Sequence, residues 1–263
     1  MSNALGDLTV VVKTFLRPMC LDAAVASIHR HWPDVYEILV LDDSPLGHQV
    51  SPDNRFRLLS SEPHIGLSAG RNRLVEATTT PLVAVFDDDF VVSAAVRLDI
   101  LAEAVAQDVC DLLAPAVREA AGYWNGGWIY EGSPPVLSKM QQARSVEVVQ
   151  ISGLPITIYR VDQVNNAFVA RTAFLKKVRW DERLHLKEHD DFALRSSRMG
   201  RIAYTPDATV EHCPIDPKPY RRYREDTARF EEVFQRTWGI SKIDKSEDWY
   251  RHVPEPPHPE VAT

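Results

Sequence analysis

Short apolar runs that alternate with helical segments are the sequence feature that most restricts how this chain can fold. Strands are expected at Leu8–Val12, Glu37–Leu41, Phe56–Leu59 and Pro81–Phe86, and helices at about Met19–His31 and Gly70–Ala77. Continuous apolar runs are typical of strands buried on both faces, and strands that alternate with helices indicate βαβ units. We therefore expect an α/β fold, a single Rossmann-like domain with a mainly parallel central sheet.

Length and composition exclude several other classes of protein. A chain of 263 residues can build one substantial core, and its net charge of −7 does not fit a general nucleic-acid binder, which needs basic surface. The cysteines Cys20, Cys110 and Cys213 have no zinc-site spacing, so we expect reduced thiols. No apolar run approaches the roughly 20 residues of a membrane span. The first residues do not resemble a secretory signal, so we expect a cytoplasmic protein.

Two acidic clusters follow directly after predicted strands. Asp42-Asp43 ends the second strand, and Asp87-Asp88-Asp89 ends the fourth. In parallel sheets, ligands gather at the carboxyl ends of the strands. Carboxylates this close repel each other, and a bound magnesium or manganese ion would relieve that repulsion. The alternative is a solvated turn after a strand.

The segment between these clusters, His64–Asn72, combines two glycines with a basic residue at the start of a helix. Gly66 and Gly70 permit a tight turn, and Arg71 follows. A helix N-terminus and a guanidinium group together favour a phosphate oxygen. The segment alone is also compatible with an ordinary loop.

Two later segments carry further titratable side chains. Glu188-His189-Asp190-Asp191 precedes or opens a helix, where the acids either cap the helix dipole or include a carboxylate that accepts a proton from an attacking hydroxyl. His212, near the end of a late strand expected at Ala208–Cys213, is either structural or a metal ligand. Local sequence leaves both pairs of alternatives open.

The remaining segments are less regular. We expect Gly122–Pro155 to be an irregular excursion over the site, order to return at Val164–Arg171, and a helix at Asp190–Met199. From Lys218 onward, a helix presents one aromatic face, formed by Tyr223, Phe230, Phe234 and Trp238. The run Lys218–Arg224 is either a peripheral contact with a membrane or lipid diphosphate or a solvated helix face. The prolines from Pro254 to Pro259 indicate a loose tail.

Taken together, these segments resemble the glycosyltransferase-A superfamily, and family 2 in particular. The motifs, in order, are Thr14, Asp42-Asp43-Ser44, Gly66–Asn72, Asp87–Asp89, Arg171 to Arg183, and Glu188–Arg195. A closer likeness is to the catalytic domain of the animal β-1,4-N-acetylgalactosaminyltransferases that build ganglioside head groups. It is carried by Val12–Arg17, Gly70–Asn72, Asp87–Phe90, Val117–Glu119, Ala170–Thr172 and His189–Phe192.

The resemblance covers about residues 8–213 and implies a glycosyltransferase-A catalytic domain at residues 1–215, with a helical extension and tail at 216–263. Its implied nucleotide-sugar-binding residues are Thr14, Asp43, Gly70, Arg71 and Asp88. Asp43 matches the acid that contacts uracil or ribose, and Arg71 matches a residue of the diphosphate region. The implied ligands of Mn²⁺ or Mg²⁺ are Asp87, Asp89 and His212.

The catalytic base is the point at which this chain departs from the family pattern. Family 2 usually has Glu-Asp where this chain has Glu188-His189, so a histidine occupies the customary base position. The resemblance therefore implies a base among Glu188, His189, Asp190 and Asp191, and we favour Asp190 and Asp191.

The activity that the resemblance implies is an inverting, metal-dependent transfer of a sugar from a nucleotide diphosphate. The expected donor is UDP-N-acetylgalactosamine or UDP-N-acetylglucosamine, and the expected acceptor is a hydroxyl of a glycan or glycoconjugate. One alternative is a sugar nucleotidyltransferase, but the Gly-rich loop typical of that class is replaced by Lys13–Arg17, which has no glycine. The other is a non-catalytic carbohydrate-binding protein, which needs no diphosphate site. No nucleic-acid partner is expected.

Overall fold

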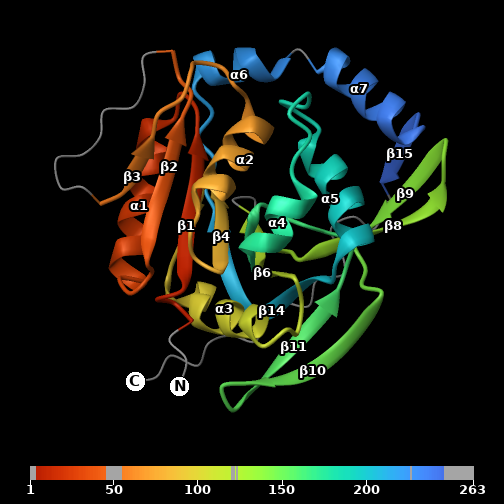
Figure 1. Ribbon diagram of the computed structural model, residues 1–263. Helices are drawn as coiled ribbons and strands as arrows, with labels where there is room; N and C mark the ends of the chain where they lie inside the picture. Colours follow the sequence, from red (N-terminus) through yellow and green to blue (C-terminus); the bar gives the residue numbers. More distant parts are fainter. Residues whose placement is uncertain (1–3, 46–54, 120–121, 123, 226, 246–263) are drawn as a thin grey trace.

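A computed structural model of the protein describes residues 4–45, 55–119, 122, 124–225 and 227–245. An 11-stranded sheet runs through the molecule between helices (Figure 1). In spatial order its strands are β10 (Ser145–Ile151), β11 (Leu154–Arg160), β14 (Ile202–His212), β6 (Leu112–Glu119), β13 (Ala167–Arg171), β4 (Leu82–Asp87), β1 (Leu8–Thr14), β2 (Glu37–Asp42) and β3 (Arg57–Leu59). Two short strands lie off this path: β5 (Phe90–Val91) pairs with β14, and β7 (Trp124–Asn125) pairs with β6.

The sheet is parallel in one half and mixed in the other. Strands β4, β1, β2 and β3 are parallel neighbours, as the alternation of strands and helices predicts. Beyond β4, strand β13 is antiparallel to both β4 and β6, while β14 is parallel to β6. Strands β10 and β11 form an antiparallel hairpin. A mainly parallel sheet is therefore correct only for the N-terminal half, because hairpins rather than a helical crossover connect β6 to β13.

Helices cover both faces of the sheet, which explains why its strands are continuously apolar. On one face, α1 (Pro18–His31) and α3 (Leu98–Ala106) pack against alternate strand residues such as Val10 and Val12. On the other, α2 (Leu67–Ala77), α4 (Thr172–Val178) and α5 (Glu188–Met199) pack against the residues between them, such as Val11. Successive side chains of a strand point to opposite faces, so β1 is buried throughout.

The middle of the chain is regular, so the irregular excursion expected at Gly122–Pro155 is wrong. Strands β8 (Gly127–Ser133) and β9 (Val136–Met140) form a hairpin and belong to a second sheet with β12 (Gln163–Val164) and β15 (Lys242–Lys245). Gly132, with a φ of 92°, and the following prolines lie where this hairpin reverses. Glycine and proline here mark a tight turn between strands rather than a long loop.

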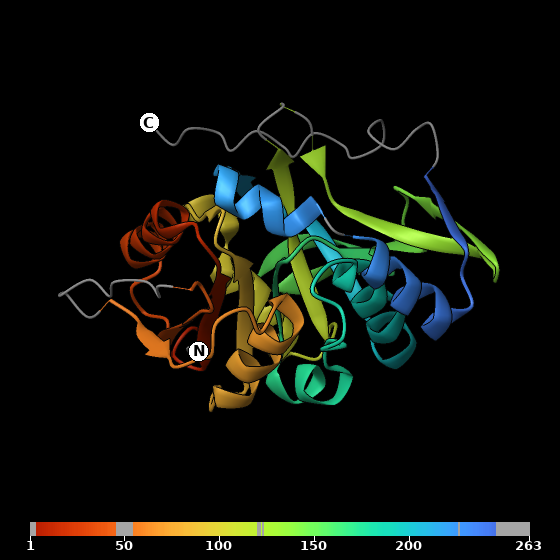
Figure 2. The same ribbon diagram turned by 90° about the horizontal axis from the view of Figure 1, so that it is seen from above.

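The C-terminal segment forms two helices, α6 (Lys218–Glu225) and α7 (Ala228–Trp238), where one was expected. Seen from above, they lie across the edge of the sheet (Figure 2). Phe230 and Phe234 of α7 share a hydrophobic cluster with Tyr130 and Leu137 of the β8–β9 hairpin. The extension therefore packs as part of the same body, and a boundary at residue 215 stays a prediction.

The proline-rich tail expected at Pro254–Pro259 lies outside the described residues. No helix in the described part of the chain has both the length and the apolar character needed to cross a bilayer.

Candidate active site

The two acidic clusters lie at one edge of the sheet, as predicted from their positions after strands. Parallel pairing sets Thr14 of β1 beside Asp42 of β2, and Lys13 beside Asp87 of β4. Strand β14 reaches the same edge because its last residue, His212, pairs with Phe90, which directly follows the Asp87–Asp89 turn. Four segments of sequence thus supply polar side chains to one crevice.

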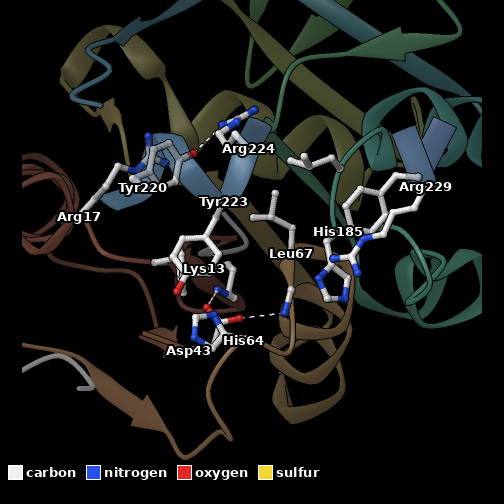
Figure 3. A pocket seen from close by; sticks show the side chains of 14 residues that line it. Lys13, Arg17, Asp43, His64, Leu67, His185, Tyr220, Tyr223, Arg224 and Arg229 are labelled. Carbon is white, nitrogen blue, oxygen red and sulfur yellow. Dashed lines mark hydrogen bonds and ion pairs between the residues drawn. The ribbon is translucent and has the colours of Figure 1, made fainter. Parts of the chain in front are cut away.

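A cavity of about 250 Å³ opens beside this edge, beneath α6 and α7 (Figure 3). Its polar lining carries four cations, namely Lys13, Arg17, Arg224 and Arg229. Among the described lining residues, Asp43 is the one acid. Guanidinium and ammonium groups in such numbers suit phosphate oxygens. The cavity therefore fits an anionic ligand that also has a flat apolar part.

Lys13 and Asp43 form a buried ion pair on the wall of this cavity (Figure 3). Lys13 also donates to the carbonyl oxygen of Thr14 at 2.8 Å, and the other oxygen of Asp43 accepts from the backbone N–H of Gly66 at 2.8 Å. Burial lowers the pKa of Lys13, although Asp43 opposes that shift.

Gly70 is needed for the course of the Lys13 side chain. A Cβ atom at position 70 would lie 2.5 Å from Cδ and Cε of Lys13, closer than real contacts allow. Gly70, predicted as part of the nucleotide-sugar site, therefore contributes by lacking a side chain, which leaves room for the buried Lys13.

Three aromatic rings gather at the same cavity. The rings of Phe15 and His64 have centroids 5.3 Å apart, and Tyr223 of α6 lies 5.0 Å from Phe15 and 4.9 Å from His64. Tyr223 lines the cavity although it is 52% exposed, and the buried Tyr220 lines it too, with its ring on the Arg17 guanidinium at 4.3 Å. Such rings form a platform on which a planar base can stack.

Arg17 neutralises the acidic turn after β4. It forms ion pairs with Asp88 and, at 2.7 Å, with Asp89, while Thr14 Oγ1 donates to Asp88 at 2.6 Å. Burial raises the pKa of Asp88 to about 7, against the effect of Arg17. Burial would also raise the pKa of Asp89, but His212 and Arg17 lower it to about 2.

His212 faces this turn from the end of β14. Its Nε2 lies 3.4 Å from Oδ2 of Asp89, and its Nδ1 lies 2.6 Å from Oε2 of Glu119. Burial would lower the pKa of His212, but the two carboxylates raise it to about 10.

The three predicted metal ligands do not converge. Asp87 points instead toward Arg71, at 2.5 Å, and Asn166, at 3.2 Å. Within the described ranges, no group of three or more His, Cys, Asp or Glu side chains is arranged to hold a metal ion. Only Asp89 and His212 of the predicted set lie together.

Arg71 is the centre of a second buried network. It pairs with Asp87 at 2.5 Å and with Glu188 at 3.1 Å. His189 Nε2 lies 3.2 Å from Glu188 and 2.9 Å from the side-chain amide of Asn166, which also donates to Asp87. The predicted diphosphate arginine therefore holds two acids in place, and His189 sits at the open side of the network with 41% of its side chain exposed.

Asp190 and Asp191, the favoured base candidates, are both engaged elsewhere. Asp191 is completely buried, and its oxygens accept from Arg195 at 2.8 Å and from the Trp238 indole at 2.8 Å. Asp190 accepts from Tyr130 at 2.6 Å and Lys139 at 2.9 Å. The position of Asp191 does not favour the base role, because both of its oxygens are occupied away from solvent.

Several residues of this site were not singled out from the sequence. Lys13 and Arg17 belong to the Val12–Arg17 segment that carries the family likeness, but neither was given a role of its own. Tyr220 belongs to the basic run that was considered a membrane contact, and Tyr223 was expected on an aromatic helix face but not at a ligand cavity. Asn166 could not be identified from the sequence, because no motif around it indicates its contact with His189 of α5.

Comparison with known proteins identifies the relatives of this chain. Residues 9–179 match the family model described as glycosyl transferase family 2. The chain is 33% identical over 223 residues to the β-1,4 N-acetylgalactosaminyltransferase 1 of Rattus norvegicus. That match covers 80% of this chain and 39% of the relative, so the chain spans about two fifths of the length of that protein.

Solved structures share the fold at low sequence identity. The structure of S. aureus TarS residues 1–349 in complex with UDP-GlcNAc matches with a TM-score of 0.60 and 16% identity, over 87% of this chain and 64% of that one. The structure of GalNAc-T7 with UDP, GalNAc and Mn²⁺ matches with a TM-score of 0.61 and 15% identity, over 87% and 47%.

Proposed function

Because this chain belongs to glycosyl transferase family 2, we propose that it transfers a sugar from a UDP-sugar to an acceptor hydroxyl, with inversion and with the help of a divalent cation. The donor that we propose is UDP-N-acetylgalactosamine or UDP-N-acetylglucosamine, which agrees with the names of the rat relative and of the TarS complex. One observation carries the proposal: the acidic edge formed by Asp43, Asp88 and Asp89 borders a cavity lined by four cations.

The floor of the cavity is complementary to uracil. Uracil presents an acceptor, a donor and an acceptor along one edge: O2, N3–H and O4. Asp43 supplies an acceptor for N3–H, and the Lys13 ammonium beside it has a third N–H, beyond the two donated to Asp43 and Thr14, that can reach a carbonyl oxygen of the base. Cytosine places a lone pair at N3, which a carboxylate would repel. Stacking against Phe15, His64 and Tyr223 would hold the base in this position.

The diphosphate would then lie toward Arg17 and the acidic turn. Arg17 and Arg224, which both contact the Tyr220 ring, supply guanidinium donors on that side, while Arg229 lies across the cavity beside His185 (Figure 3). Asp89 and His212 fit a cation, because Oδ1 of Asp89 is buried with no hydrogen-bond partner and the imidazole of His212 lies beside the same carboxylate. A bound Mn²⁺ or Mg²⁺ supplies Lewis-acid stabilisation of the departing diphosphate.

His189 is the base that the geometry supports best. It is the more exposed member of its network, and Glu188, only 3% exposed, lies 3.2 Å from its Nε2. His189 would accept the proton of the acceptor hydroxyl, and Glu188 would stabilise the resulting imidazolium. Arg71 holds Glu188 in position from the other side.

The products formed from a UDP-sugar test this proposal. With UDP-α-N-acetylgalactosamine and Mn²⁺, water can replace the acceptor, and proton and phosphorus nuclear magnetic resonance identify what is released. We expect UDP and the β-anomer of the free sugar before mutarotation. An initial α-anomer would contradict inversion, and sugar phosphate with UMP would indicate a different cleavage. A carbohydrate-binding protein would release nothing.

Peripheral membrane contact and a cytoplasmic location remain proposals. On α6, Tyr220 is buried against the cavity, whereas Lys218, Arg221 and Arg222 are exposed. They supply attraction to an anionic surface, next to the half-exposed ring of Tyr223. Sedimentation with anionic vesicles, compared with an Arg221→Glu, Arg222→Glu variant, tests the contact, and cell fractionation tests the location.

A further inference from the structure

Glu119 links the end of β6 to the proposed cation ligand His212. The two residues are direct register partners on parallel strands, so their backbones fix their separation. Oε2 of Glu119 lies 2.6 Å from Nδ1 of His212, and Oε1 accepts from the side-chain amide of Asn125 at 2.8 Å. Asn125 is buried on β7, which pairs with β6. Both oxygens of Glu119 are therefore held in place.

This arrangement determines where the other nitrogen of His212 points. Nδ1 faces Glu119, and the ring lies against Phe90, with centroids 5.0 Å apart and planes inclined at 30°. Nε2 then faces Asp89, 3.4 Å from its Oδ2. A histidine that donates one ring N–H to a carboxylate presents its second nitrogen as a ligand of defined direction.

We propose that Glu119 is a positioning residue that orients His212 toward a divalent cation, with Asn125 orienting Glu119 in turn. This inference rests on the proposed function, because it requires the cation to bind at Asp89 and His212. It assigns a role in cation affinity to a side chain that does not itself touch the cation. A purely structural bond between two strand ends would affect stability and leave that affinity unchanged.

Glu211 provides a matched control. It lies at the same end of β14 and pairs with Arg118 of β6 at 3.4 Å, but its side chain is 47% exposed and directed away from His212 toward that arginine. Glu211→Gln therefore makes the same chemical change at the same strand ends without touching the proposed relay.

Electron paramagnetic resonance of free Mn²⁺, recorded with saturating UDP, measures the affinity without any turnover. We expect Glu119→Gln to weaken Mn²⁺ binding about 10- to 100-fold, Asn125→Leu to weaken it less, and Glu211→Gln to leave it unchanged. Circular dichroism confirms that each variant is folded, and Asn125→Leu replaces Glu119→Gln as the test if the latter fails to fold.

The comparison with His212→Ala separates the two ways of failing. If His212→Ala loses affinity while Glu119→Gln and Asn125→Leu bind Mn²⁺ like the wild type, the role of Glu119 is contradicted and the cation site stands. If His212→Ala also binds Mn²⁺ like the wild type, the cation site of the proposed function is wrong, and the role of Glu119 falls with it.

Discussion

Arg71 donates through Nη1 to Oε1 of Glu188 over 3.1 Å, which joins the start of α2 to the start of α5 inside the protein. Its Nη2 pairs with Asp87 at the end of β4. These two acids share one guanidinium that is 1% exposed. Two motifs far apart in sequence are therefore linked by a single buried charge.

Replacing Arg71 should destabilise the protein strongly. Arg71→Met would leave Asp87 and Glu188 without their buried partner, and breaking a buried ion pair costs about 3–5 kcal/mol. Denaturant unfolding measures this cost. Arg73→Met is the control, because Arg73 pairs with Glu62 at the surface and should change stability by about 0.5 kcal/mol or less. Equal effects of the two substitutions would contradict the network.

Asp43→Asn should change which nucleotide the cavity prefers. An amide can turn a donor toward N3 of the base, so the preference for UDP over CDP should fall or reverse. Competition binding with UDP and CDP measures the ratio of affinities. Asp42→Asn, whose carboxylate bonds to Ser44 rather than lining the cavity, should keep the wild-type ratio. An unchanged ratio of UDP to CDP affinity in Asp43→Asn would contradict the proposed hydrogen bond between Asp43 and N3–H of uracil.

His189→Gln and Asp191→Asn distinguish the base from its neighbour. Loss of a general base lowers kcat by roughly 10²–10⁴-fold, which we expect for His189→Gln with little change in UDP affinity. Asp191→Asn should instead lower stability by about 2 kcal/mol, because it weakens charged hydrogen bonds to Arg195 and Trp238. A large fall in kcat for Asp191→Asn but not for His189→Gln would instead identify Asp191 as the base.

The strands of the N-terminal half could be predicted because burial on both faces leaves a simple pattern. β1, β2, β4 and α1 lie within a few residues of their expected positions. The hairpins of the middle could not, because β10 is largely exposed, with Val146 and Val148 on its open side, and lacks a continuous apolar run. The antiparallel return of β13 depends on tertiary pairing that no local pattern reports.

The positions of site residues that directly follow strands could be predicted from the sequence. The ion-pair partners of these residues could not, because they come from distant segments. Asp43, Asp88 and Asp89 stand at strand ends, so their common edge follows from parallel pairing. Which arginine pairs with which carboxylate depends on tertiary contacts between segments that are far apart in the sequence. Arg71 forms an ion pair with Asp87, which was expected to bind the metal, and Arg195 forms one with Asp191, which was expected to be the base.

Asp111, Arg171 and Arg201 form a third network at the opposite end of the strands. This network makes the free energy of unfolding depend on pH. Burial alone would raise the pKa of Asp111, but hydrogen bonds from Arg201 and Arg171 lower it below the ordinary value of 3.8. A lowered pKa stabilises the fold above pH 3.8, and the gain is lost as the pH falls through the folded-state value.

Asp111→Asn should therefore lose about 2 kcal/mol of stability at pH 7, and its deficit relative to the wild type should shrink below pH 3.8. Urea unfolding between pH 2.5 and 7 follows this difference. Asp34→Asn, at an exposed position, should show no comparable deficit. A deficit that grows toward low pH would have the wrong sign for the ion pairs of Asp111.

Calorimetric titration of UDP in the presence and absence of Mn²⁺ tests the central claim most directly, because it couples the nucleotide cavity to Asp89 and His212. We predict that Mn²⁺ tightens UDP binding by roughly tenfold or more, and that Asp89→Asn binds UDP with the same weaker affinity in Mn²⁺ and in EDTA. Equal affinities of the wild-type protein under both conditions would contradict a cation held against the diphosphate.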